Sequence, residues 1–286
     1  MMNKYSIGIC TYNRSDILKE TLKSIVKYIS HDNIEIIIVN NNSKDDTGSI
    51  INELIANNKN YDITYILELN QGLSFARNKI IDSAKYENIL FLDDDAVLVS
   101  NVTFEYDKAI DEYPNCYIFG GKVIPQLDIE YPKWFKKEFH MLYSILDEGD
   151  ETKYFPSKLG PIGANFLVKK SYIGSVRFRT DLGRIGNILL SGEETDFLIK
   201  IGFNSSNSCY VGTAVVSHYF PVSRYSKTWA LERFKQNGIS NRKLKESYPS
   251  LLYGFLSEGY QLLKAMKTMN TFYIQCRLVS IINYVR

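Results

Sequence analysis

The stretch Ile89-Leu90-Phe91-Leu92-Asp93-Asp94-Asp95 decides the fold, because a short apolar run leads directly into three consecutive carboxylates. A run of bulky apolar residues of this length is typical of a buried strand. Aspartates at the end of such a strand can hold a hard cation such as Mg²⁺ or Mn²⁺, which prefers carboxylate oxygen and is often shared with substrate phosphates. A solvated acidic turn is the alternative, so the flanking sequence has to distinguish the two.

Three similar runs of β-branched and aliphatic residues precede this stretch, at Ile7–Cys10, Ile34–Val39 and Ile63–Leu67. Later in the chain, Phe166–Val168 and Ala214–Val216 have the same character. Each run has the length and composition of a strand.

The segments between the first runs are patterned for helices. Apolar residues recur there at three- and four-residue spacing, as on one face of a helix: Leu18, Leu22, Ile25 and Ile29. Ser15 can cap this helix, a second helix is predicted after Ser43–Thr47, and a third over about Ser74–Lys85. Alternating strands and helices predict a parallel, three-layer α/β sheet, in which ligands bind outside the carboxyl ends of the strands.

Polar side chains follow all four of the first strands. They occupy Thr11–Arg14, Asn40–Ser43, Asn70–Gly72 and Asp93–Asp95. Solvated loops explain any one of these clusters, but four clusters at one edge of a sheet indicate a binding site.

Charge and cysteine content narrow the class of protein. The chain has 286 residues and a net charge of +2, but residues 221–286 carry eleven Lys and Arg against three Glu, a net of +8, so the first 220 carry −6. This tail favours phosphate, nucleic-acid or anionic-membrane contact, or is a solvated helical face. The four scattered cysteines indicate neither zinc nor disulfides. The N-terminus runs straight into a strand, so we expect no signal peptide and a reducing, cytoplasmic setting.

Taken in order, these motifs resemble those of the family 2 glycosyltransferases with a GT-A fold, over about residues 5–240. The matching segments are Cys10–Arg14, Val39–Ser43, Asn70–Gly72 with Ala76–Asn78, Asp93–Asp95, Gly163–Asn165, Gly192–Asp196 and His218. Such enzymes transfer a sugar from a nucleotide diphosphate, usually with Mg²⁺ or Mn²⁺ and inversion at the anomeric carbon. The resemblance implies a mixed, mostly parallel Rossmann-like sheet flanked by helices.

The resemblance also implies a domain division. Residues 1–220 would form the catalytic domain, with a nucleotide-binding half at about 1–100 and an acceptor-side half at 101–220. Residues 221–286 would form a basic, mostly helical extension.

Donor-binding roles follow from the resemblance. Residues implied to bind the donor are Thr11, Tyr12, Arg14, Asn40, Asn42, Arg77, Asp93 and Asp94. A tyrosine ring such as Tyr12 can stack on a pyrimidine, and Arg14 can reach the diphosphate. Asn40 stands where many relatives carry an aspartate that accepts a hydrogen bond from the base N3–H, so uracil is favoured less firmly and thymine stays open. Arg77 would contact the base or diphosphate, or else is a surface arginine.

Metal and catalytic roles follow in the same way. Asp95 and Asp93 would form the metal site, with Asp95 as the direct ligand and Asp93 either nearer the ribose or behind the direct ligand. His218 would add a metal or phosphate contact or be structural. Glu194 is the expected general base for the acceptor hydroxyl. Glu193 and Asp196 are its alternatives, although Asp196 also suits the first turn of a helix.

The sequence indicates less about the acceptor than about the donor. We expect a glycan or lipid-linked acceptor in surface polysaccharide or glycoconjugate synthesis, and no nucleic-acid partner. Trp134 is either a platform for a sugar ring or part of the core. The basic segment with Arg224, Ser226, Trp229 and Arg233 resembles one that closes over the donor in some relatives. The remaining amphipathic tail suits a peripheral contact with the inner face of a membrane or a homodimer.

Other classes of protein fit less well. A non-catalytic nucleotide-sugar-binding or scaffolding protein would not need the acids at Glu193–Asp196. A dehydrogenase would want G-x-G-x-x-G after the first strand, and Thr11–Arg14 has no glycine. A nucleotidyltransferase would want a glycine-rich, lysine-bearing phosphate loop near the start, which is missing.

Overall fold

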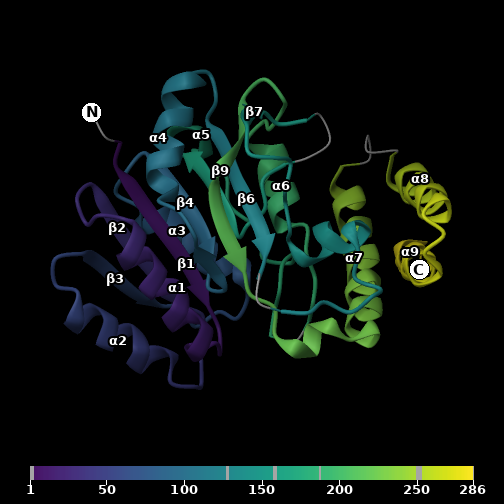
Figure 1. Cartoon of the computed structure of the whole chain (residues 1–286), viewed down its shortest axis with the longest axis horizontal. Coiled ribbons are helices and arrows are strands. Elements are labelled where there is room, and N and C mark those ends of the chain that lie inside the picture. Colours follow the sequence, from purple (N-terminus) through teal and green to yellow (C-terminus); the bar gives the residue numbers. More distant parts are fainter. Residues whose placement is uncertain (1–2, 127–128, 157–159, 187, 249–252, 286) are drawn as a thin grey trace.

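The computed structural model describes residues 3–126, 129–156, 160–186, 188–248 and 253–285. Its strands form one mixed sheet in the order β3-β2-β1-β4-β8-β6-β9-β5, with β7 paired to β9 (Figure 1). The strands are β1 Tyr5–Thr11, β2 Ile34–Asn40, β3 Asp62–Leu67, β4 Asn88–Asp93, β5 Ala96–Leu98, β6 Ile118–Pro125, β7 Thr152–Tyr154, β8 Asn165–Lys169 and β9 Ser208–His218. The predicted α/β fold is confirmed.

The parallel part of the sheet is built from the runs that the sequence marks as strands. β1 pairs in parallel with β2 and β4, and β2 pairs in parallel with β3. The second part of the sheet is mixed, because β8 is antiparallel to β4 and β6, whereas β6 and β9 are parallel.

Helices cover both faces of this sheet (Figure 1). They are α1 Ser15–Tyr28, α2 Thr47–Asn57, α3 Leu73–Ser83, α4 Val102–Glu112, α5 Lys170–Ile173 and α6 Glu193–Lys200. The predicted cap of α1 is wrong. Ser15 is the first helical residue, Arg14 is at the N-cap without a capping side chain, and the Ser15 amide donates to Asp45 Oδ2 at 3.1 Å instead.

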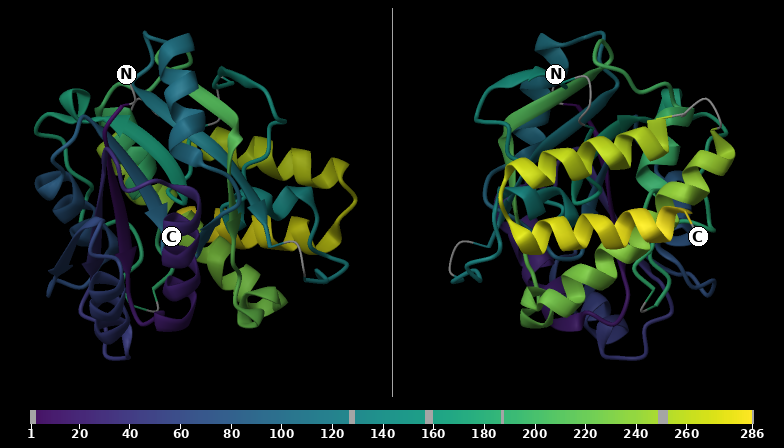
Figure 2. Two further views of the ribbon diagram at one scale, coloured as in Figure 1. Left: turned by 60° about the vertical axis from the view of Figure 1, so that its left-hand side comes forward. Right: turned by 90° about the vertical axis from the view of Figure 1, so that its right-hand side faces the viewer.

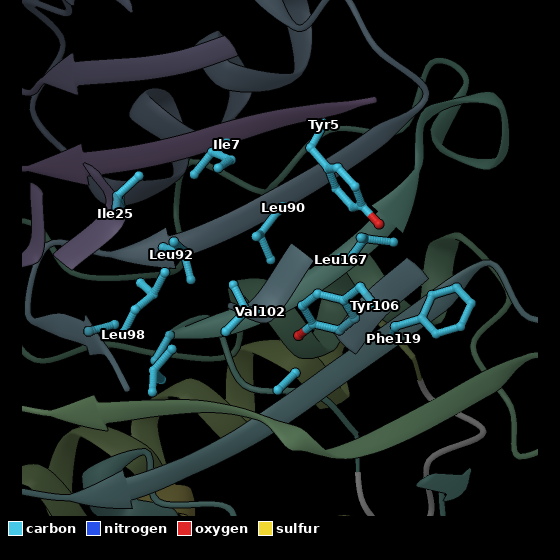
Figure 3. Close-up of a cluster of buried hydrophobic side chains, with 14 of the residues drawn as sticks. Tyr5, Ile7, Ile25, Leu90, Leu92, Leu98, Val102, Tyr106, Phe119 and Leu167 are labelled. Atoms are coloured by element: carbon cyan, nitrogen blue, oxygen red, sulfur yellow. The ribbon is translucent and has the colours of Figure 1, made fainter. Parts of the chain in front are cut away.

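Alternate residues of the central strands enter two cores, one on each face. In β4, Leu90 and Leu92 pack in the core that contains α1 and α4, whereas Ile89 and Phe91 pack in the core that contains α3 and α6. Figure 3 shows the first core, in which Leu90 and Leu92 lie near Ile7, Val102 and Tyr106. Because both faces are buried, the strand is apolar from Ile89 to Leu92, and its first partly exposed position, Asp93, comes at its carboxyl end.

The C-terminal helices form a separate layer. They are α7 Lys227–Ser247, α8 Tyr253–Lys267 and α9 Thr271–Val285, and two 3₁₀ turns, η1 Lys137–Tyr143 and η2 Val222–Tyr225, lie before them in the chain. α7 lies between the sheet and the α8–α9 pair, and α8 and α9 run side by side (Figures 1 and 2). Among the described residues, no helix has the length and apolar character needed to cross a membrane.

The aromatic segment before η1 packs against this layer. Trp134 lies 5.2 Å from Phe139 and 5.1 Å from Phe272 between ring centroids, in edge-to-face geometry. Phe139, Phe234, Phe272 and Tyr273 belong to the same buried cluster. Trp134 therefore has the core environment that was the alternative to a sugar platform.

Candidate active site

The sheet topology brings the predicted metal ligands together. Asp93 ends β4, where it lies opposite Cys10 of β1, and Asp95 follows in the turn to β5. β5 pairs with the end of β9, so that Ala96 lies opposite His218. Carboxylate and imidazole side chains that are 123 positions apart in sequence, those of Asp95 and His218, are thereby within 2.9 Å.

Asp93, Asp95 and His218 offer donor atoms that all lie within 4.8 Å of one another. His218 Nδ1 faces the carbonyl oxygen of Tyr143 at 3.1 Å, and because a carbonyl only accepts, this nitrogen carries a hydrogen. The other nitrogen, Nε2, is directed at Asp95. Two carboxylates and an imidazole held in this orientation fit a divalent cation.

Arg14 lies against the same aspartates. Its Nη1 atom is 2.7 Å from Asp94 Oδ1 and 2.6 Å from Asp95 Oδ2. Burial opposes ionisation of Asp95, but Arg14 and His218 outweigh it and hold the pKa of Asp95 well below its usual range. Burial dominates at Asp94 and raises its pKa despite Arg14. The pKa values of these two neighbouring carboxyl groups are therefore shifted in opposite directions.

Arg77 forms ion pairs with two acids of α6 and with Asp93. Its guanidinium lies 3.0 Å from Glu193, 2.8 Å from Glu194 and 3.3 Å from Asp93, and its side chain is only 3% exposed. It is thus not a surface arginine. Gly163 makes this arrangement possible, because a Cβ atom there would lie 2.0 Å from Glu194 Oε1 and 2.2 Å from Arg77 Nη2.

The three acids of α6 differ in what they face. The side chain of Glu194 is 29% exposed in the cavity, whereas that of Glu193 is 6% exposed and has one oxygen without a hydrogen-bond partner. Asp196 is fully buried and binds Lys200, Tyr248 and Arg179, so it lies outside the cavity lining. Burial raises the pKa of Glu194, as do Glu193 and Asp93, against the opposing effect of Arg77.

The amides after β2 have unequal positions. Asn40 is buried, with its oxygen accepting from the Ser43 amide at 2.9 Å and its nitrogen donating to Tyr65 at 3.0 Å. Asn42 accepts from Lys44 and, like Asn40, does not line the cavity. Asn41 does, and its oxygen accepts from the Gly72 amide at 2.7 Å. Asn41 therefore joins the β2 and β3 loops beneath the site.

One cavity of about 1170 Å³ connects these groups. Thr11, Tyr12, Arg14, the three aspartates and Glu193–Glu194 line one side. Arg224, Trp229 and Arg233 line it from η2 and α7, together with Arg184 from the loop before α6. Sequence reasoning missed Arg184, although its flanking glycines, Gly183 and Gly186, mark an irregular loop just before the acids.

A family model described as glycosyl transferase family 2 matches residues 6–174. The chain belongs to this family. This glycosyltransferase is 24% identical over 257 residues to the glucosyl-dolichyl phosphate glucuronosyltransferase of Haloferax volcanii, an alignment covering 86% of this chain and 79% of the relative. It is 27% identical over 227 residues to the GalNAc(5)-diNAcBac-PP-undecaprenol β-1,3-glucosyltransferase of Campylobacter jejuni, covering 71% and 72%.

Solved structures show the same fold. A mannosyltransferase from Pyrobaculum calidifontis, solved with GDP-Man and Mn²⁺, superposes with a TM-score of 0.65 at 16% identity, covering 98% of this chain and 74% of that one. Staphylococcus aureus TarS residues 1–349, solved with UDP-GlcNAc, superposes with a TM-score of 0.57 at 17% identity, covering 98% and 89%. The GT-A fold predicted for this glycosyltransferase is therefore confirmed.

Proposed function

We propose that this glycosyltransferase moves a sugar from a nucleoside diphosphate donor to an acceptor hydroxyl with inversion, using Glu194 as general base. The observation that carries the proposal is the position of Glu194. Glu193 and Glu194 both line the cavity, but the side chain of Glu194 is 29% exposed there against 6% for Glu193, and Asp196 is buried outside the lining. Burial also raises the pKa of Glu194, which makes the carboxylate a stronger base than an exposed one.

The donor fits the side of the cavity formed by the strand ends. Thr11, Tyr12 and Arg14 line it, with the Tyr12 ring available for stacking on a pyrimidine. We favour UDP, with dTDP as the second choice. Arg14 forms ion pairs with Asp94 and Asp95, and from this position its guanidinium can also bind a diphosphate oxygen.

Asp93, Asp95 and His218 are the residues that would hold a divalent cation, Mn²⁺ or Mg²⁺. Such an ion supplies positive charge to a diphosphate leaving group. The protein contributes the geometry, because the Tyr143 carbonyl fixes the imidazole ring and Arg14 keeps Asp95 ionised.

In the transfer step, Glu194 takes the proton of the acceptor hydroxyl as the acceptor oxygen bonds to the anomeric carbon. The bond from that carbon to the diphosphate oxygen breaks, and its electron pair leaves with the nucleoside diphosphate. One displacement inverts the anomeric centre. Arg77 holds Glu194 in place throughout, at 2.8 Å. The relatives named above act on dolichyl- and undecaprenol-linked sugars, which supports a lipid-linked or glycan acceptor.

The donor is tested by thermal denaturation with UDP, dTDP, GDP and their sugars, each with and without Mn²⁺. A ligand at a hundred times its dissociation constant adds about 2.7 kcal/mol to stability. A rise in melting temperature that requires one nucleotide and the metal supports the donor site. Asp95→Asn should abolish the dependence on Mn²⁺.

The base is tested by Glu194→Gln, which should lower turnover by at least about a hundredfold while nucleotide binding stays near wild type. The matched control is Glu20→Gln on the exposed face of α1, which should change neither quantity. Turnover within about threefold of wild type in Glu194→Gln would reject Glu194 as the base.

A further inference from the structure

Three arginines from separate segments of the chain line the cavity. Arg184 comes from the loop before α6, Arg224 from η2 and Arg233 from the first turns of α7. They are separate from Arg14 and Arg77, which are paired with the aspartates and with the acids of α6.

These three arginines have few carboxylate partners. Within the described part of the chain, the Arg184 guanidinium forms no ion pair or side-chain hydrogen bond. Among the described residues, Asp95 is the one carboxylate within ion-pair distance of Arg224, at 3.8 Å. Arg233 donates to the carbonyl oxygen of Leu189 at 2.7 Å, and its Nε atom is buried without a hydrogen-bond partner. A buried donor without an acceptor is costly, so an anion in the cavity would stabilise the group.

Burial and repulsion by a neighbouring arginine both lower the pKa of a guanidinium group. Burial lowers the pKa of Arg233 to about 10, and the positive charge of Arg184 is the next cause. Both guanidinium groups line the same cavity, where their charges repel each other. Like charges that gather in a cavity without counter-charge are the arrangement that an oxyanion neutralises.

The cluster extends toward the proposed base rather than only toward the metal ligands. Arg224 lies 3.8 Å from Asp95, whereas the negative charges of Glu193 and Glu194 act on Arg233 and raise its pKa. An acceptor must bring its hydroxyl to Glu194, so a charged group of the acceptor would lie near Arg233 and Arg184. The cavity of about 1170 Å³ exceeds the range of about 300–1,000 Å³ that is usual for one ligand.

We propose that Arg184 and Arg233 form a second anion-binding subsite, which holds a phosphate or phosphodiester group of the acceptor while the donor diphosphate lies beside Arg14 and the aspartates. The assignment to the acceptor rests on the proposed function, because Glu194 defines the acceptor side. The same two arginines could instead bind a donor diphosphate that reaches across the cavity. Competition between sulfate and nucleotide distinguishes these two ligands.

The experiment titrates the full-length chain with sulfate, a tetrahedral dianion that does not precipitate with Mg²⁺, against chloride at equal ionic strength. Melting temperature is followed without nucleotide and with saturating nucleotide and Mg²⁺, using whichever of UDP, dTDP and GDP gives the largest shift. The variants are Arg184→Ala, Arg184→Gln and Arg233→Ala. The control is Arg177→Ala, an exposed arginine paired with Asp82. General salt effects on stability are common to all of them.

We expect the half-saturating sulfate concentration to change by less than about threefold when nucleotide is bound. It should rise at least about tenfold in the Arg184 and Arg233 variants and stay unchanged in Arg177→Ala. Loss of the sulfate response on adding nucleotide would overturn the proposal, because the arginines would then bind the donor diphosphate. An unchanged response in the folded variants, or no response in the wild type, would also overturn it. A wild type that binds sulfate but no nucleotide would instead reject the proposed donor site while supporting the anion subsite.

Discussion

Arg77 joins the metal side of the cavity to the proposed base, because one guanidinium contacts Asp93, Glu193 and Glu194. Three carboxylates around a buried site would repel one another without this charge. A planar guanidinium offers donors in several directions, whereas a lysine ammonium is a single point charge. The identity of this residue therefore matters for stability as well as for the position of Glu194.

Arg77→Met should lower the free energy of unfolding by about 3–5 kcal/mol, because it leaves buried carboxylates without their partner. Arg77→Lys should cost less, since it keeps the charge but cannot form all three contacts. Urea denaturation measures both. A loss below about 0.5 kcal/mol in Arg77→Met would show that the acids do not depend on it.

The acid limb of the pH profile should report on Glu194. Its pKa is raised above the ordinary 4.5, first by burial, and only the ionised carboxylate can act as base. We therefore expect kcat/KM to fall as the pH falls through a midpoint above 4.5, at saturating metal. The limb should be missing from the residual activity of Glu194→Gln. A wild-type midpoint at or below 4.5 would contradict the assignment.

At the scale of elements, the position of α7 depends on a close helix contact. A Cβ atom at Gly238 would lie 2.1 Å from the carbonyl oxygen of Ser280 in α9, so only glycine fits there. The other faces of α7 carry Phe234 into the C-terminal core and Arg233 into the cavity. The packing of α7 on α9 therefore fixes one wall of the site.

Gly238→Ala should destabilise the protein by about 1–3 kcal/mol, because the clash is with backbone that cannot move without separating the helices. Gly259→Ala in α8 is the matched control, since a Cβ atom there meets nothing within 4 Å and alanine favours helix. Thermal denaturation compares the two. Equal melting temperatures for both variants would show that the α7–α9 contact is not tight.

At the scale of the whole molecule, the cavity lies between two parts of the chain. The strand ends of the first hundred residues supply the aspartates and Arg14, and α6, η2 and α7 supply the acids and the remaining arginines. We propose that the helices after residue 220 complete the site rather than merely follow it. A ligand that contacts both parts would then couple them.

Nucleotide with Mn²⁺ should therefore slow amide hydrogen exchange in η2 and the first turns of α7 as well as after β1 and β4. Protection follows because the bound ligand must leave before either part opens. Helix α2, which contributes no residue to the cavity lining, serves as the internal control. Protection confined to the strand ends would show that the C-terminal helices do not take part in donor binding.

The sequence by itself determined the parallel half of the sheet and most of the acidic and amide motifs at its edge. Short apolar runs such as Ile89–Leu92 are typical of strands buried on both faces, and the carboxyl ends of parallel strands meet at one edge of the sheet. The periodicity of apolar residues and the amino-acid composition are properties of short segments, so they can be recognised without knowledge of the fold. The GT-A family was likewise recognisable from the order of short motifs.

Only the tertiary structure decided which polar side chains face the cavity. Asn40 and Asn41 are neighbours and both are buried, yet Asn41 lines the cavity and Asn40 does not. Glu194 and Asp196 are two positions apart on one helix and point to different surroundings. Arg77 is buried because residues more than a hundred positions away surround it. Burial and ion pairing are sums over contacts from distant segments, and no local pattern contains them.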